Sequence, residues 1–142
     1  MKPLPDSDVP VVDAQTGLMT RDWYDYFLIL DRAKPVAIQL KYGTTIQTDA
    51  SSGDVFFIDF TDGTSFTIAA PKNGIPGQII TYVIRNFSGG APGGISWETP
   101  AFRTAFGTLP NDGFSRSVEF VYDGSNWTET FRAPSPGDVP NE

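Results

Sequence analysis

Carboxylates come closer than any other side chains of this sequence to a catalytic pattern. The chain contains no histidine and no cysteine, so it lacks the commonest general base and the thiol nucleophile. Asp54, Asp59 and Asp62 lie close together, but their spacing matches neither the Asp-x-Asp-x-Asp-Gly loop of a Ca²⁺ site nor a glycosidase motif. Glu119 and Glu129 are expected on adjacent strands of one hairpin, where exposed carboxylates usually form a solvated face. We therefore predict a protein that is not an enzyme, with no catalytic residue, cofactor or metal.

Aromatic residues offer a second kind of chemistry, the stacking of a ring on the apolar face of a sugar. Their alternation with other strand residues favours core packing instead. If one ring is exposed, Trp127 is the candidate glycan contact, because it lies beside a predicted hairpin turn. The aromatic residues concerned are Trp97, Trp127, Tyr82 and Tyr122.

Charge and hydropathy exclude two classes of partner. The net charge is −7 and the ten basic residues are scattered, whereas a non-specific hold on nucleic acid needs clustered Lys and Arg. No apolar run reaches 18 residues, and the first residues do not resemble a signal peptide. We therefore expect no nucleic-acid partner and no membrane insertion.

The elements that must position these residues are mainly short β-strands in the range 54–132. Residues 55–60 form an almost continuous apolar run, which predicts a strand covered on both faces. An Asp-Gly pair at 62–63 predicts a hairpin turn. Ile80, Tyr82 and Ile84 alternate toward the core in the longest predicted strand, and the last hairpin joins 114–122 to 127–131. With no period of 20 to 50 residues, the pattern predicts a single β-sandwich or jelly-roll-like domain.

An apolar stretch in residues 20–33 predicts a short helix that begins after Thr20. Trp23, Tyr26, Phe27 and Leu30 recur at helical spacing, and other apolar residues occupy the remaining sides. Such a helix must be covered all round. It is either a central core helix or a helix shared between subunits. We assign it to an oligomer interface formed by these four residues.

The remaining segments flank the helix and the β-domain. Residues 1–19 contain several prolines and predict an extended N-terminal arm with a turn at 13–17. This arm is either a disordered terminus or a segment that lies on a neighbouring molecule. Residues 34–53 are assigned to a linker, although 35–42 also fits a short strand, and 133–142 to a flexible tail. The candidate attachment residues of the arm are Val9, Pro10, Val11, Val12 and Leu18.

Several motifs, taken in order, resemble small β-rich virion proteins of tailed bacteriophages, of the head-fibre, tail-fibre, adaptor or capsid-decoration type. The arm carries Pro10-Val-Val-Asp-Ala-Gln-Thr-Gly17 before Thr20 and Trp23. The β-region carries Asp62-Gly-Thr-Ser-Phe-Thr-Ile-Ala-Ala-Pro71, Gly77-Gln78, Gly93-Gly-Ile-Ser-Trp97 and Phe120-Val-Tyr-Asp-Gly-Ser-Asn-Trp127. The resemblance implies a non-enzymatic subunit of the virion, commonly a homotrimer, whose N-terminal part contacts other capsid or tail proteins.

These observations lead to one main hypothesis and two alternatives. The main hypothesis is a trimeric phage structural protein, attached to the particle by its arm, with the β-domain outward. The first alternative is a carbohydrate-binding module that recognises a host-surface glycan. The second is a glycan-cleaving enzyme that relies on the carboxylates named above.

Overall fold

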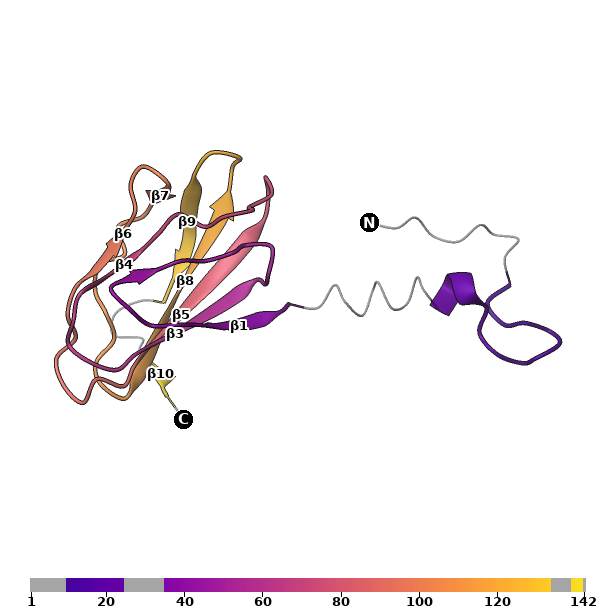
Figure 1. Ribbon diagram of the computed structural model, residues 1–142, viewed down its shortest axis with the longest axis horizontal. Helices are drawn as coiled ribbons and strands as arrows, with labels where there is room; N and C mark the ends of the chain where they lie inside the picture. The colour runs from indigo at the N-terminus through magenta and orange to yellow at the C-terminus, as the bar shows by residue number, and fades with distance from the viewer. Residues whose placement is uncertain (1–9, 25–34, 134–138, 142) are drawn as a thin grey trace. The chain divides into compact units, whose positions relative to one another are not determined.

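The structure is a computed structural model that describes residues 10–24, 35–133 and 139–141 (Figure 1). The chain divides into two compact units, Met1–Pro35 and Val36–Glu142. The second unit is the larger and contains every strand found in the described residues.

The second unit is built from β-strands, which confirms the mainly β class. Its described residues form ten strands: β1 (Ala37–Leu40), β2 (Thr45–Ile46), β3 (Val55–Phe60), β4 (Phe66–Ile68), β5 (Ile79–Asn86), β6 (Ile95–Trp97), β7 (Phe102–Arg103), β8 (Phe114–Tyr122), β9 (Trp127–Arg132) and β10 (Val139–Pro140). A seven-stranded sheet has the order β1-β3-β5-β8-β9-β7, with β10 paired to β8, and a three-stranded sheet has the order β2-β4-β6.

Successive strands alternate between the two sheets at the start of this unit. Strands β1, β3 and β5 pair in parallel in the large sheet, and β2, β4 and β6 pair in parallel in the small sheet. Each strand of the large sheet together with the next strand of the small sheet therefore makes one rung, and three rungs stack into a short β-solenoid. The predicted sandwich or jelly-roll topology is wrong in this respect. The steps from Ala37 to Val55 and from Val55 to Thr81 are unequal, which explains why no fixed period is visible in the sequence.

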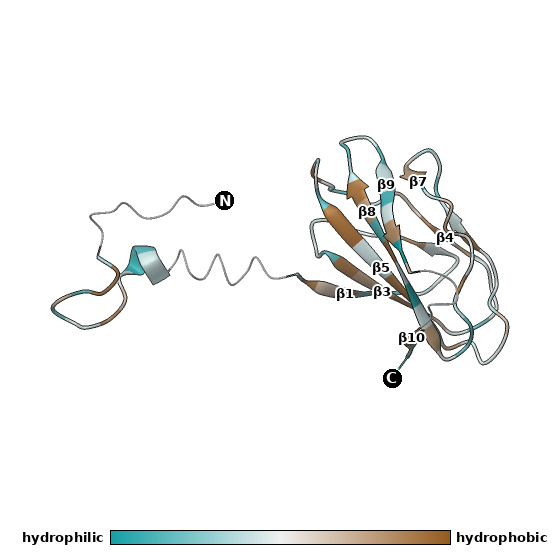
Figure 2. Ribbon diagram, turned by 180° about the vertical axis from the view of Figure 1, so that it is seen from behind, coloured by the Kyte–Doolittle hydropathy of each residue, from teal (hydrophilic) through white to brown (hydrophobic). Residues whose placement is uncertain are grey.

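Side-chain alternation places the core between the sheets. In β5, Ile80, Tyr82 and Ile84 are fully buried, as predicted, and Figure 2 shows hydrophobic residues along β3, β5 and β8. In β3 only alternate residues are buried, while Phe57 and Asp59 are half-buried. The prediction that both faces of this strand are covered is therefore wrong. Strand β5 is also one residue shorter than β8, the longest strand among the described residues, so the prediction that β5 is the longest is wrong.

One predicted hairpin is confirmed and the other is wrong. Strands β8 and β9 pair antiparallel, with Tyr122 opposite Trp127. Strands β3 and β4 belong to different sheets, so the Asp62-Gly63 segment is an arch between sheets and not a hairpin turn. Asp62 holds this arch by accepting hydrogen bonds from Thr64 N and from the Tyr42 hydroxyl, both at 2.8 Å.

The boundaries of the β-domain also differ from the prediction. Residues assigned to a linker at 34–53 include β1 and β2, which belong to the solenoid. Residues 139–141 of the predicted tail contain β10, which pairs with Phe114 and Ser115. The β-unit therefore begins at Val36 and reaches the last described residue.

The described part of the first unit is a small loop followed by the start of a helix. Val12 and Met19 form an antiparallel bridge around a turn, and Asp13 Oδ1 accepts hydrogen bonds from Gln15 N and Thr16 N. This confirms the turn, but residues 10–19 form a hairpin-like loop and not an extended arm. Residues 21–24 are helical, and the rest of the predicted helix lies outside the described residues.

Candidate functional site

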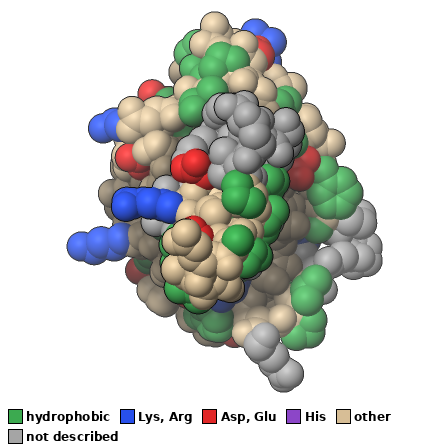
Figure 3. All heavy atoms as spheres, turned by 90° about the vertical axis from the view of Figure 1, so that its right-hand side faces the viewer, with side chains coloured by type: hydrophobic (Ala, Val, Ile, Leu, Met, Phe, Trp, Pro, Cys, Tyr) green, Lys and Arg blue, Asp and Glu red, His purple; other side chains and the backbone are tan. Residues whose placement is uncertain are grey.

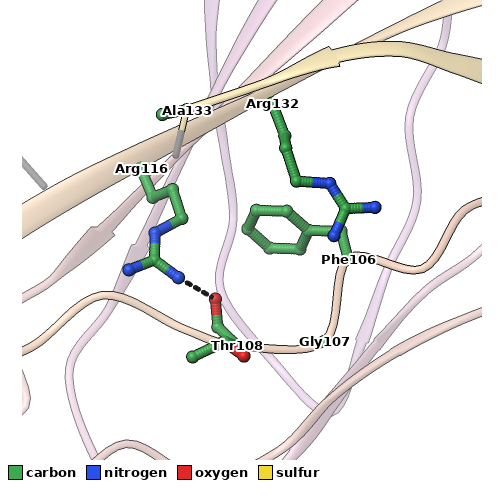
Figure 4. A pocket seen from close by; sticks show the side chains of 6 residues that line it. All are labelled: Phe106, Gly107, Thr108, Arg116, Arg132 and Ala133. Carbon is green, nitrogen blue, oxygen red and sulfur yellow. Dashed lines mark hydrogen bonds between the residues drawn. The ribbon is translucent and has the colours of Figure 1, made fainter. Parts of the chain in front are cut away.

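A pocket of about 220 Å³ lies beside the β8–β9 hairpin (Figure 4). Two arginines and an aromatic ring dominate its lining. The lining residues are Phe106, Gly107, Thr108, Arg116, Arg132 and Ala133. Strands β8 and β9 contribute the arginines, and the segment between β7 and β8 contributes the opposite wall.

Arg116 is a cation held in the interior. Its residue is only 6% exposed, and its Nη1 donates to Thr108 O at 2.9 Å. In β8 the inward positions alternate through Arg116, Val118 and Phe120. A charged residue in such a series is costly to bury unless it has partners, and the carbonyl of Thr108 is one of them.

Arg132 is fixed by Glu129. The two residues form a bidentate ion pair, through Nε to Oε1 and through Nη2 to Oε2, the geometry in which Arg and a carboxylate bind most strongly. The guanidinium carbon of Arg132 also lies 5.9 Å from the centroid of the Phe106 ring.

Glu129 receives further hydrogen bonds from the segment after β7. Thr104 Oγ1 donates to Glu129 Oε2 at 2.5 Å, and Ala105 N donates to the same oxygen at 3.3 Å. Partial burial raises the pKa of Glu129, but the hydrogen bonds from Arg132 and Thr104 outweigh this effect and the net pKa is lowered. Glu129 is therefore ionised at neutral pH and has no proton to donate as a general acid.

The two guanidinium groups of the lining are already engaged, Arg132 by the Glu129 carboxylate and Arg116 by the Thr108 carbonyl. The six lining residues include no carboxylate, and their one hydroxyl belongs to Thr108. Among the described residues no group of three or more acidic side chains could hold a metal ion. The lining of the pocket therefore contains no nucleophile paired with a base.

The carboxylates considered in the sequence are kept apart by the fold. Asp54 Oδ2 accepts from Val36 N at 3.1 Å, while Asp59 forms an ion pair with Arg85. The register of the last hairpin places Glu119 opposite Phe131, and Glu129 opposite Phe120. Glu119 and Glu129 therefore do not face each other, as a pair of glycosidase acids would.

Trp127 is buried, which corrects its assignment as a glycan contact. Its residue is 2% exposed, and its ring stacks on Tyr122 with centroids 4.6 Å apart. The loop that carries Gly74 closes over both rings, because a Cβ built on Gly74 would lie 2.7 Å from Trp127 Cζ2. No face of Trp127 is left for a sugar in this structure.

The predicted oligomer residues fall mostly outside the described range. Trp23 lies in the helical residues 21–24 and is half-buried, whereas Tyr26, Phe27 and Leu30 are outside the described residues. Among the attachment residues, Val9 is also outside. Val11, Val12 and Leu18 are 43%, 51% and 69% exposed, and Pro10 is exposed too. The loop of the first unit therefore presents apolar side chains on its surface.

No motif in the sequence pointed to this pocket. The sequence feature that could have indicated this pocket is Arg116, a charged residue at an inward position of a strand whose other inward residues are apolar. The wall opposite it comes from Thr108, whose segment is irregular and has no periodicity to place it.

The described residues contain no helix that is long and apolar enough to span a membrane. Comparison of the chain with known proteins found no matching family model, no matching curated protein and no matching solved structure.

Proposed function

We propose that this chain is a non-enzymatic structural protein of a bacteriophage virion, of the short-fibre, adaptor or capsid-decoration type. The proposed protein is a homotrimer in the virion. Its N-terminal arm binds other capsid or tail proteins, and its β-unit faces outward, where it is available to a host-surface glycan.

The observation that carries the proposal is the division of the chain into two units of different character. The first unit exposes apolar side chains on its described loop, and its sequence continues into the apolar stretch 23–30. The second unit has its own core, drawn from both sheets. An apolar stretch in the sequence outside a unit that has its own core is suited to assembly, because a contiguous apolar patch on a protein surface often marks an interaction site.

The motifs support the same proposal. Figure 3 shows one side of the molecule, where hydrophobic side chains lie in several groups between charged ones. The resemblance to small phage virion proteins spans motifs in both units. A carbohydrate-binding module is the weaker alternative, since Trp127 is buried and another aromatic face would have to bind the sugar.

The oligomeric state tests the central part of the proposal. Native mass spectrometry at micromolar concentration is expected to show a trimer. Replacing Trp23→Asp together with Phe27→Asp is expected to yield monomers, because two charges cannot be buried at the subunit axis without partners. Phe131→Asp is the control, since this residue is 59% exposed on the β-unit, and it should leave the trimer intact.

A monomeric wild-type chain would contradict the trimer. Mass spectrometry of purified phage particles tests the second part of the proposal, and absence of the chain from particles would contradict a virion role. A chain that is trimeric but absent from particles would support the oligomer and contradict the virion role.

A further inference from the structure

Strand β1, the large-sheet strand of the first rung, is covered less well than the large-sheet strand that stacks on it. Ile38 pairs in register with Phe56, and Leu40 with Ile58. Phe56 and Ile58 are fully buried, while Ile38 and Leu40 are only half-buried. Tyr42, just after β1, is half-buried as well. Inward apolar side chains of β1 therefore lack the cover that a further strand provides in the other rungs.

In the described residues, the edge of β1 that faces away from β3 also has unpaired backbone groups. Among the described residues only β3 pairs with β1. Val36 O accepts a hydrogen bond from Val55 N at 3.1 Å, so the backbone groups of Val36 point toward β3. Successive residues of a strand direct their backbone groups to opposite sides. The N–H and C=O groups of Ala37 and Gln39 therefore point to the open edge.

Strand β1 has few of the features that stop an edge strand from pairing with a strand of another chain. Edge strands are usually blocked by a bulge, a proline or an inward charge. Strand β1 reads Ala-Ile-Gln-Leu and is paired without a register shift. Lys41 follows it and Pro35 precedes it, but neither lies within the strand. A solenoid end of this kind normally needs a cap.

We propose that β1 is a subunit contact, in which an extended segment of a second copy of this chain pairs with its open edge and covers Ile38 and Leu40. This inference rests on the proposed oligomer, since it names a contact within it. A second copy is the occupant that the sequence favours, because the predicted oligomer helix at 20–33 ends a few residues before β1. Copies joined through that helix would hold their β1 strands near one another, at high effective concentration.

Amide hydrogen exchange read at single residues tests the contact. In the wild-type oligomer the N–H groups of Ala37 and Gln39 are expected to exchange slowly, like those of Ile38 and Leu40, which point toward β3. In the variant with both Trp23→Asp and Phe27→Asp, the first pair should exchange at least about tenfold faster while the second pair stays protected.

Two results would overturn the inference. Fast exchange at Ala37 and Gln39 in the intact oligomer would mean that no strand covers the edge, while the oligomer itself would stand. Slow exchange in the dissociated variant would mean that the chain covers its own edge. Native mass spectrometry reads the oligomer independently, so a monomeric wild type would be recognised as failure of the proposed function, and it would overturn this contact as well.

A proline on the edge gives a second measurement. Ala37→Pro removes an N–H that points away from β3 and suits an edge position, so the β-unit should keep its circular dichroism spectrum. The trimer is expected to dissociate at a concentration on the order of tenfold higher, from the lost hydrogen bonds. Ala91→Pro, in the exposed loop between β5 and β6, is the matched control and should leave dissociation unchanged. Equal dissociation of both variants and the wild type would contradict the contact.

Discussion

Trp127 owes its burial to a glycine on a neighbouring loop. The loop passes over the Tyr122–Trp127 stack, and it is anchored there by a hydrogen bond from Gly77 N to Tyr122 O at 2.7 Å. Any side chain at Gly74 would meet the rings, since its Cβ would lie 2.7 Å from Trp127 Cζ2 and 3.1 Å from Tyr122 Cδ1. A buried indole ring has little room to move aside in a close-packed core.

Gly74→Ala is therefore expected to lower the free energy of unfolding by about 1–3 kcal/mol, the usual cost of overpacking. Urea denaturation followed by tryptophan fluorescence measures this change. Gly90→Ala is the control, because a Cβ at this position would have nothing within 4 Å, and it should change stability by less than about 0.5 kcal/mol. Equal effects of the two substitutions would show that the loop does not close over Trp127.

Glu129 links strand β9 to the segment after β7 through one carboxylate. Hydrogen bonds from Arg132 and Thr104 favour its charged form and lower its pKa, against the opposing effect of burial. The Glu129 carboxylate in turn raises the pKa of Arg132. A group with a lowered pKa in the folded state stabilises the fold above its unfolded pKa, and this contribution is lost as the pH falls through the folded pKa.

Glu129→Gln is therefore expected to make stability depend less on pH in the acidic range. The Tm of the wild type should fall between pH 7 and pH 3 by more than that of the variant, with most of the difference arising below the ordinary pKa of 4.5. Differential scanning calorimetry over this pH range makes the measurement. Parallel profiles for the two proteins would contradict the assigned role of the carboxylate.

Between the two sheets, one buried hydrogen bond ties the solenoid rungs together. The hydroxyls of Thr48 and Tyr82 lie 2.7 Å apart, and both residues are fully buried. Thr48 lies just after β2 and Tyr82 lies in the middle of β5, so the bond connects the first rung with the third. Burial raises the pKa of Tyr82, which keeps its hydroxyl neutral as this contact requires.

Tyr82→Phe is expected to destabilise the β-unit by about 1–3 kcal/mol, because it leaves the Thr48 hydroxyl buried without this partner. Thr48→Val should have a similar effect for the reciprocal reason. The double variant should cost less than the sum of the two, since it removes both polar groups. Chemical denaturation of the four proteins completes the cycle, and strict additivity would show that the two hydroxyls do not interact.

The whole chain combines a small unit with exposed apolar side chains and a larger unit with a closed aromatic core. In the core, Trp97 packs with Phe102 and Phe120 at centroid distances of 4.8 and 5.1 Å. Phe102 and Phe120 are buried in this cluster, and Trp97 is half-buried against them. The proposed contacts between copies instead use the helix at 20–33 and the edge of β1. Native mass spectrometry and amide exchange test these two places separately.

Local pattern alone was enough to predict the class of the fold and several of its parts. Alternation with a period of two identified Ile80, Tyr82 and Ile84 as inward residues, and the turn at 123–126 identified the β8–β9 hairpin. Both are short-range features, since a strand shows its faces in its own residues and a tight hairpin joins neighbours in the chain.

Tertiary structure alone decided which strand lies beside which. The period of a strand tells which side chains face the core, but not which distant strand pairs with it. For this reason β3 was expected to pair with β4, whereas it lies between β1 and β5. The burial of Trp127 under the Gly74 loop and the meeting of Arg116 with Thr108 have the same origin, because each depends on segments that only the packed fold brings into contact.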